Sequence, residues 1–267
     1  LGPLITALGT GGTAELQVNA AGALMTLALK KENKLAIIQA DGVPPLVTLL
    51  YDAPEEVKAI AAGALMNIAL KNPKGQNAVT GGGAILPLAD LLIVGAPETK
   101  AAAAAALLNL VVGHPQNKVT LAELGAIDPL IELLSEGNDD AKEHAAAALW
   151  NLAGNWKNRQ RITQLKGIPP LVELLQSGTS AAQAKAAGAL ATLCHKNVDN
   201  KVEVVESGAL PVLVGILMDG AKETKETATA VLQSLATIPI NRPAIADAGA
   251  IPLLVELLKD RSSLILL

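Results

Sequence analysis

The sequence contains almost no aromatic residues. Among its 267 residues there is no Phe, and Tyr51, Trp150 and Trp156 are the complete aromatic set. A core without Phe must be filled by Leu, Ile, Val and Ala, whose small side chains let helices approach one another closely. With 51% hydrophobic and 17% charged residues, the composition excludes an intrinsically disordered chain and favours helices.

Cysteine and histidine are also scarce. Cys194 is the single cysteine, so an internal disulfide is excluded, and one thiol with three scattered histidines makes no structural zinc site. A reducing compartment, cytoplasmic or nuclear, fits this cysteine usage best. We expect neither a metal nor a cofactor.

The chain has neither a strong basic charge nor a long apolar run. Its formal net charge of −4, from 21 basic and 25 acidic residues, gives no overall field that would hold nucleic acid. The longest uncharged stretch, residues 101–117, is interrupted by Asn109, Gly113 and Pro115, so we expect no membrane insertion. No signal peptide opens the chain, and because it begins at Leu1 without Met, we expect a piece of a longer or renumbered chain.

The sequence instead contains a repeat. A phrase of the type GAIPLLVELL occurs six times, and its first Leu after the proline region recurs every 41 or 42 residues. These anchor positions are Leu46, Leu88, Leu130, Leu171, Leu213 and Leu254, with a clipped copy at Leu4. A second phrase of the type AAGALMNIA lies about twenty residues further on, and its alanine-rich face predicts a buried helix. A short segment that ends at Gly, such as 117–125, completes each unit.

Each unit therefore predicts a short helix, a Gly-Pro turn, a middle helix, a polar turn and a long third helix. One unit alone has too little apolar surface to be stable, whereas stacked copies share a continuous core. We predict an all-α, right-handed solenoid that forms one domain over residues 1–267. Full repeats are expected at 32–72, 73–115, 116–155, 156–198 and 199–240, with partial repeats at 1–31 and 241–267. The apolar residues 264–267 would be adhesive if exposed, so we expect a missing cap, end-to-end self-association or a partner there.

Two phrases in fixed phase, the three-helix unit and the period of 41 to 42 residues resemble the armadillo repeat family over essentially the whole chain. The resemblance implies a superhelix whose third helices line a concave groove. Importin-α relatives place a row of Trp in that groove, and this chain has only Gly or Ala at those positions. They are Gly22, Gly63, Ala105, Ala147, Gly188 and Ala230. The chain is therefore more similar to catenin-like and plant-type armadillo arrays.

One polar side chain stands at an equivalent position of each third helix. The six residues are Thr26, Asn67, Asn109, Asn151, Thr192 and Ser234. An Asn amide has both a donor and an acceptor, so such a row can pair with the backbone of an extended peptide. The row resembles the asparagine ladder of importin-α and β-catenin relatives. The alternative is that each Asn ties adjacent repeats together or caps a local carbonyl.

Four further residues join the candidate peptide-binding set: His144, Asn155, Trp156 and Lys185. The main contact cluster is predicted at Asn109, His144, Asn151, Asn155 and Trp156. Trp150 is expected to pack in the core or between repeats. Lysines one turn after the polar row favour an acidic ligand, but the helix dipole also places lysine at helix C-termini, so the charge of the ligand stays open. These lysines are Lys30, Lys71 and Lys196.

Each candidate catalytic motif in the sequence has a structural explanation that accounts for it better. Cys194 occupies a position that holds Ala or Val in other repeats, and the adjacent His195 would point about 100° away from it on a helix. The glycine-rich segments 9–12 and 81–83 lack the Gly-Lys-Ser/Thr ending of a phosphate-binding loop. We therefore expect a non-enzymatic scaffold that binds an extended segment of another protein.

The sequence leaves three alternatives to this interpretation. A nuclear-transport adaptor that recognises a basic signal is disfavoured by the missing Trp row. The repeats could also be the substrate-targeting arm of a larger enzyme, such as a ubiquitin ligase or a kinase. A designed or consensus array without a natural partner is disfavoured by the unequal lengths of the units.

Overall fold

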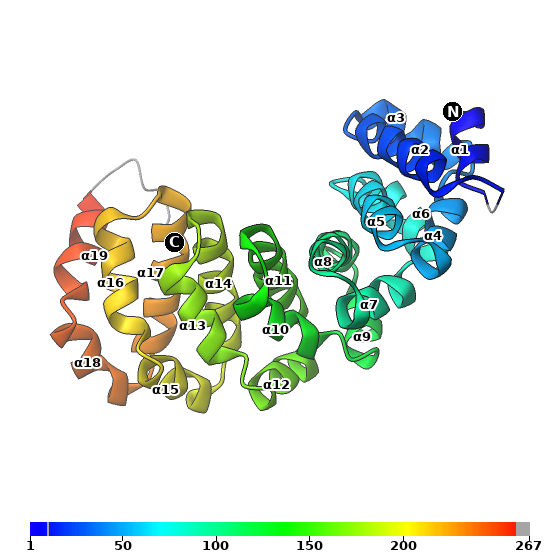
Figure 1. The fold of residues 1–267 in the computed structure, drawn as a ribbon. Coiled ribbons are helices and arrows are strands. Elements are labelled where there is room, and N and C mark those ends of the chain that lie inside the picture. The colour runs from blue at the N-terminus through cyan, green and yellow to red at the C-terminus, as the bar shows by residue number, and fades with distance from the viewer. Residues whose placement is uncertain (10, 260–267) are drawn as a thin grey trace. The chain divides into compact units, whose positions relative to one another are not determined.

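The computed structural model describes residues 1–9 and 11–259, and within them the chain consists of helices joined by short turns (Figure 1). The prediction of an all-α fold is confirmed. The chain divides into two compact units, Leu1–Leu133 and Leu134–Leu267. A single domain over residues 1–267 therefore stays a prediction, and the apolar residues 264–267 lie outside the described residues.

The first unit contains a two-helix remnant followed by two full repeats. Its helices are α1 (Gly2–Ala7), α2 (Ala14–Leu27), α3 (Lys31–Gln39), α4 (Val43–Asp52), α5 (Glu55–Ala69), α6 (Pro73–Gly81), α7 (Ile85–Val94), α8 (Pro97–Val111) and α9 (Pro115–Glu123). The chain passes into the second unit within α10 (Ile127–Glu136).

The second unit continues the same pattern. Its helices are α11 (Asp139–Leu152), α12 (Trp156–Gln164), α13 (Ile168–Ser177), α14 (Ser180–Leu193), α15 (Val198–Glu206), α16 (Ala209–Asp219), α17 (Lys222–Ala236), α18 (Arg242–Asp247) and α19 (Ala250–Lys259), with a 3₁₀ turn at Pro239–Asn241. The repeat boundaries predicted from the period fall in or beside the turns that follow the third helices.

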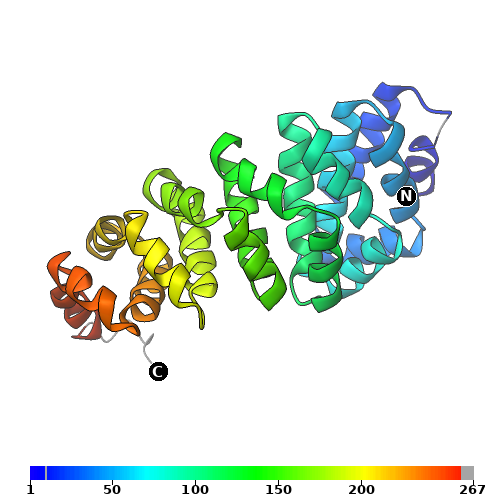
Figure 2. The ribbon, with the colours of Figure 1, turned by 90° about the horizontal axis from the view of Figure 1, so that it is seen from below.

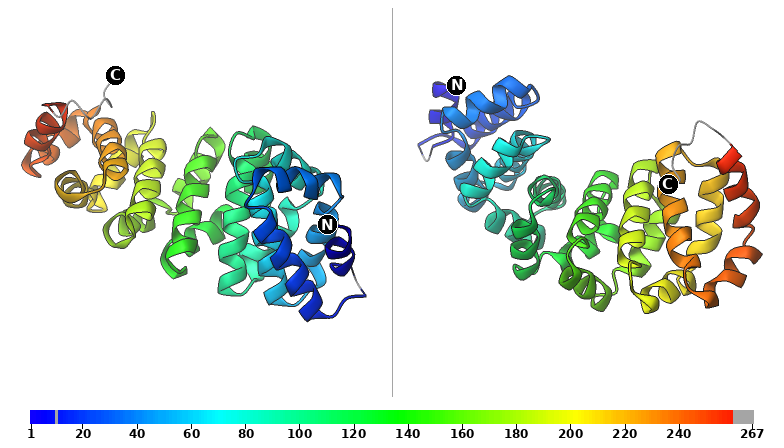
Figure 3. Two further views of the ribbon diagram at one scale, coloured as in Figure 1. Left: turned by 90° about the horizontal axis from the view of Figure 1, so that it is seen from above. Right: turned by 180° about the vertical axis from the view of Figure 1, so that it is seen from behind.

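Alanine-rich third helices form the centre of each unit. In the first unit α5 packs between α2 and α8, and in the second unit α14 packs between α11 and α17. Other directions of view show these neighbours side by side within each unit (Figures 2 and 3). Their contact surfaces are fully buried alanines, such as Ala61 and Ala64 in α5 and Ala186 and Ala187 in α14. Small side chains permit this close approach of helices.

The turn between the first and second helix of a repeat requires a left-handed residue. Glycine supplies it in four repeats, with φ between 79° and 83° at Gly83, Gly125, Gly208 and Gly249. Asp41 and Lys166 hold the equivalent positions with φ of 58° and 57°. Left-handed backbone is strained for any residue with a Cβ, so these two repeats carry a local cost that the others avoid.

Among the described residues no single helix is long and apolar enough to span a membrane, and α6 with α7 satisfies the criterion only as a pair bent by 79°.

Candidate functional site

The predicted polar row lies in the last turns of the third helices. Thr26, Asn67 and Asn109 stand near the C-terminal ends of α2, α5 and α8 in the first unit. Asn151, Thr192 and Ser234 stand at the same register in α11, α14 and α17 of the second unit. Because neighbouring third helices pack directly against each other within a unit, each unit presents three of these side chains on successive helices.

Asn67 differs from the other two asparagines of the row. Its side chain is only 6% exposed, and its Nδ2 donates to the backbone carbonyl of Met25 at 2.9 Å. Met25 belongs to the preceding third helix, so this amide ties α5 to α2. The inter-repeat alternative considered for the row therefore describes the hydrogen bond at this position.

Asn109 and Asn151 are half-buried and bond within their own helices. Their Nδ2 atoms donate to the carbonyls of Ala105 at 3.1 Å and Ala147 at 2.9 Å, four residues earlier. One N–H of each amide is thereby engaged, which holds the amide in a fixed orientation. Among the described residues, neither Oδ1 atom accepts a hydrogen bond.

The two threonines of the row make the same local bond. Thr26 Oγ1 donates to the carbonyl of Gly22 at 2.9 Å, and Thr192 Oγ1 donates to the carbonyl of Gly188 at 2.8 Å. Each hydroxyl has used its one hydrogen, and its lone pairs remain. Ser234 is half-buried at the equivalent position of α17. The row therefore offers mainly hydrogen-bond acceptors.

The remaining candidate residues lie in the second unit. Asn155 is the N-cap of α12, where its Oδ1 accepts from the backbone N–H of Lys157 at 2.9 Å. Trp156, the first residue of that helix, is 57% exposed, and its ring lies 5.9 Å from Lys157 Nζ, within cation–π range. Lys185 Nζ lies 2.8 Å from Glu223 Oε1, an ion pair between α14 and α17.

His144 is half-buried in α11, and its Nδ1 is a buried atom without a hydrogen-bond partner among the described residues. Of the predicted contact cluster, His144, Asn151, Asn155 and Trp156 belong to the second unit, whereas Asn109 belongs to the first.

Trp150 packs between repeats, as expected. A Cβ added to Gly188 would lie 2.7 Å from atoms of the Trp150 ring, so the indole rests on the backbone of the next third helix. Met25 and Gly63 repeat this arrangement in the first unit, with the Met25 sulfur 2.8 Å from an added Cβ. Gly63 and Gly188 thus leave room for a large side chain of the preceding third helix. That side chain, Met25 or Trp150, stands one residue before the polar row.

A second set of asparagines, in or beside the first helices, was missed from the sequence. Its members are Asn33, Asn117, Asn158, Asn200 and Asn241, which recur at the repeat period or twice that distance. Asn200 is fully buried, and its Nδ2 donates to the carbonyl of Leu193 at 2.8 Å, at the end of the preceding third helix. Asn117 makes the equivalent bond to Leu110 at 2.7 Å. The recurrence itself is the signal that would have found this set.

In the second full repeat, a different residue donates to the carbonyl at the end of the third helix. Gly75 stands at the asparagine position there, and an added Cβ would collide with the carbonyl of Ile68. Asn72 donates from its Nδ2 to that same carbonyl at 3.0 Å. Each of these bonds satisfies one of the carbonyls that a helix leaves free at its C-terminus.

Long side chains of the first helices also reach the ends of the next third helices. Lys34 Nζ donates to the carbonyl of Leu70 at 2.7 Å, and burial lowers the pKa of this lysine. Gln76 Nε2 donates to the carbonyl of Asn109 at 2.8 Å, and its Oε1 lies 3.1 Å from His114 Nε2. The end of α8 that carries Asn109 is therefore held from outside its own helix.

The thiol of Cys194 is fully buried, and burial raises its pKa to about 12. A thiol in that state is an inert core side chain rather than a nucleophile. Among the described residues, no group of three or more His, Cys, Asp or Glu side chains could hold a metal ion.

Comparisons with known proteins agree with this geometry. The crystal structure of an engineered protein matches with a TM-score of 0.86 and 32% identity, covering 98% of this chain and 64% of that one. A crystal structure of computationally designed armadillo repeat proteins for modular peptide recognition matches with a TM-score of 0.77 and 32% identity, covering 88% and 99%. A designed armadillo repeat protein in complex with the peptide (KR)4 matches with a TM-score of 0.75 and 30% identity, covering 88% and 99%.

The curated proteins contain no match to this sequence. The Armadillo/beta-catenin-like repeat family matches at residues 30–70, 114–154, 157–195 and 197–237, which together exceed half of the chain. The chain therefore belongs to the armadillo repeat family.

Proposed function

We propose that this chain is a non-enzymatic scaffold that binds an extended segment of another protein across its third helices. The observation that carries the proposal is the polar row, which places an oriented acceptor at the same register of successive third helices. At Asn109 and Asn151, hydrogen bonds within the helix hold the amides while their Oδ1 atoms stay unpaired among the described residues.

These acceptors suit the backbone of an extended polypeptide. Helices packed 8–10 Å apart match about two to three residues of a strand that rises 3.3 Å per residue. Backbone N–H groups of the segment would then donate to successive members of the row, and side chains beside the row would select the sequence. Because the row's amides and hydroxyls are already oriented, little side-chain entropy is lost on binding.

The structural relatives support a peptide partner. One was designed for modular peptide recognition, and another was solved with a bound peptide. For this chain we propose a peptide partner of the same general kind, reached in the cytoplasm or the nucleus. The peptide selection described next, and not the peptides bound by these designs, would identify the sequence that this chain binds.

A peptide selection followed by substitution tests the proposal. The full chain would first be used to select binders from a random library of unstructured peptides. Affinities of a selected peptide would then be measured for the wild type, Asn109→Ala and Asn151→Ala, with the exposed Asn77→Ala as the matched control. We expect a loss of about 2- to 13-fold per row position, corresponding to the net worth of one hydrogen bond, and no loss for the control.

Melting temperatures of the same variants complete the test. Weaker binding by variants that melt like the wild type supports the proposal. Unchanged affinity in both row variants, or the absence of any selected peptide, would overturn it.

A further inference from the structure

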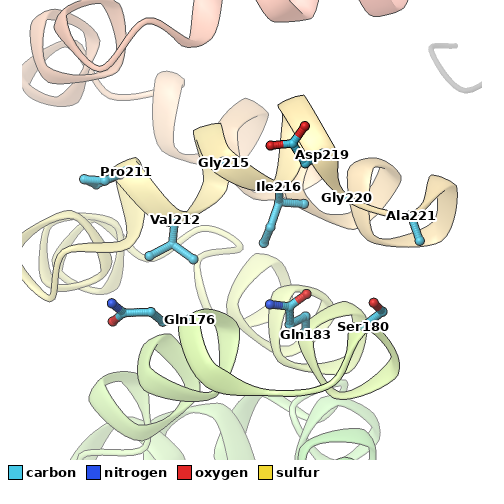
Figure 4. Close-up of a pocket in the computed structure, with 10 residues that line it drawn as sticks. All are labelled: Gln176, Ser180, Gln183, Pro211, Val212, Gly215, Ile216, Asp219, Gly220 and Ala221. Atoms are coloured by element: carbon cyan, nitrogen blue, oxygen red, sulfur yellow. The ribbon is translucent and has the colours of Figure 1, made fainter.

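The second unit contains an open pocket away from the polar row. It lies between the ends of α13 and α14 on one side and α16 with the start of α17 on the other, and it has a volume of about 520 Å³. In Figure 4, Val212 and Ile216 of α16 face Gln176 and Gln183 across the pocket, and Asp219 lies at the end of the same helix. A pocket of this size can enclose a large side chain or a small molecule.

A glycine in the middle of α16 opens this pocket. Gly215 stands where the other full repeats carry a side chain, at Thr48, Asp90, Glu132 and Glu173. A Cβ on Gly215 would meet no atom within 4 Å, so packing within the protein does not require glycine. Glycine in a helix interior costs about 1 kcal/mol relative to alanine. The missing side chain exposes the helix backbone between Val212 and Asp219 at the floor of the pocket.

The charges around the pocket are unbalanced. Gln183 stands where four other repeats carry lysine, at Lys58, Lys100, Lys142 and Lys225. Asp219 is the one charged residue that lines the pocket, and it has no ion-pair partner among the described residues.

Lysines of α14 and α17 have partners, among them Lys222, which stands next to the lining residue Ala221. Lys185 Nζ pairs with Glu223, and Lys225 Nζ donates to the carbonyl of Met218 at 2.9 Å. Among the described residues, the lining of the pocket therefore includes a carboxylate and amide oxygens but no cation.

We propose that the pocket receives an arginine or lysine side chain from a partner polypeptide. Its aliphatic part would lie over Gly215 and against Val212 and Ile216. Its cationic end would bind the Asp219 carboxylate, whereas Gln176 and Gln183, neither of which has another partner among the described residues, line the opposite side of the pocket (Figure 4).

Titration of the full ¹⁵N-labelled chain with a capped glycyl-arginyl-glycine peptide tests this site. Saturable shifts at the backbone N–H of Gly215 and the side-chain amides of Gln176 and Gln183 are expected, with a dissociation constant on the order of millimolar. Matched peptides with norleucine or glutamate in the middle position should bind at least about tenfold more weakly. Equal binding of the norleucine peptide, tighter binding of the glutamate peptide at the uncapped start of α17, or no saturable shift at all would overturn the proposal.

Three variants test whether the arginine peptide binds at this pocket. Asp219→Asn should weaken arginine binding about tenfold, whereas Asp52→Asn, the equivalent carboxylate in the first unit, should leave it unchanged. Gly215→Gln should fill the pocket and abolish binding without lowering the melting temperature, because it improves helix propensity. Thr192→Ala changes the polar row alone, so retained arginine binding in that variant separates this site from the proposed peptide face. Full binding by Asp219→Asn contradicts the assignment even if Gly215→Gln fails to fold.

Discussion

At the scale of single residues, the asparagines of this chain fall into two groups that differ in the carbonyl to which the side-chain amide donates. In the first-helix set, Asn33, Asn117, Asn200 and Asn241 donate to carbonyls at the ends of the preceding third helices, and most of the set is buried. In the polar row, Asn67 also serves a neighbouring helix, whereas Asn109 and Asn151 keep their acceptors free among the described residues. The residue type and the period are the same in both sets, so only the partner of the amide separates a structural role from a binding role.

Asn200→Ala tests the structural role. The change leaves the carbonyl of Leu193 and the Thr163 hydroxyl without the amide that now donates to them at 2.8 and 3.0 Å. Since the bond to Leu193 is buried and the bond to Thr163 is half-buried, we expect the free energy of unfolding to fall by about 1–3 kcal/mol in urea titrations. Asn77→Ala, on the exposed face of α6, should change it by less than about 0.5 kcal/mol. Equal effects of the two substitutions would show that the buried amide contributes nothing.

Lys166→Gly tests the strained turn. Lys166 has a φ of 57° where four sister repeats have glycine, and its ion pair with Glu203 is long, at 3.8 Å, and exposed on the lysine side. Removing the Cβ relieves a left-handed strain of about 1–2 kcal/mol, offset in part by the greater freedom of glycine in the unfolded chain. We expect a higher melting temperature by calorimetry, and a lower one for the reverse change Gly208→Lys. A destabilised Lys166→Gly variant would contradict this account of the turn.

At the scale of elements, neighbouring third helices fit by pairing a large side chain with a small one. Trp150 rests on Gly188 between α11 and α14, and Met25 rests on Gly63 between α2 and α5. From the sequence, Gly or Ala at these positions indicates only that the Trp row of importin-α relatives is absent. In the structure they are the surface onto which the next helix packs.

Gly188→Ala tests this fit. The added methyl would lie 2.7 Å from the indole of Trp150, so we expect a loss of about 1–3 kcal/mol in the free energy of unfolding. Gly22→Ala is the control, because a Cβ there meets nothing within 4 Å and should stabilise α2 by up to about 1 kcal/mol. The double variant with Trp150→Leu should recover much of the loss. Purely additive effects would show that the two residues do not compete for the same space.

A carboxylate joins the starts of α5 and α8. The backbone N–H of Ala96 and the hydroxyl of Thr99 donate to Glu55 Oε2 at 3.0 and 2.9 Å. These bonds lower the pKa of Glu55 below its ordinary value of 4.5, chiefly through the Ala96 N–H. Because the folded state favours the ionised form, its contribution to stability is present above that value and disappears as the pH falls through the lowered pKa.

Glu55→Gln tests this linkage. The variant should melt below the wild type near neutral pH, and the difference should shrink as the pH falls below 4.5, when followed by circular dichroism. The expected difference is small, because the Glu55 side chain is 46% exposed. A gap in melting temperature that stays constant through acid pH would contradict the assigned cause.

At the scale of the whole molecule, the repeat period predicted the helix triplets because every unit must bury the same apolar faces against its neighbours. The anchor leucines Leu46, Leu88, Leu171 and Leu213 are buried, as that argument requires. Hydrogen-bond partners could not be predicted in the same way, because Asn67 and Asn109 hold equivalent positions in sequence but bond to different carbonyls. The pocket at Gly215 was also missed, because a missing side chain leaves no motif.

The most direct measurement of the central claim is a double-mutant cycle between the protein and a selected peptide. In the peptide, single backbone amides would be replaced one at a time by esters, which removes the N–H donor and keeps the chain extended. The affinity of each ester peptide would be measured for the wild type and for Asn151→Ala. We predict that one ester position loses about 0.5–1.5 kcal/mol with the wild type and nothing further with Asn151→Ala. Additive losses at every ester position would contradict the claim that this row binds a peptide backbone.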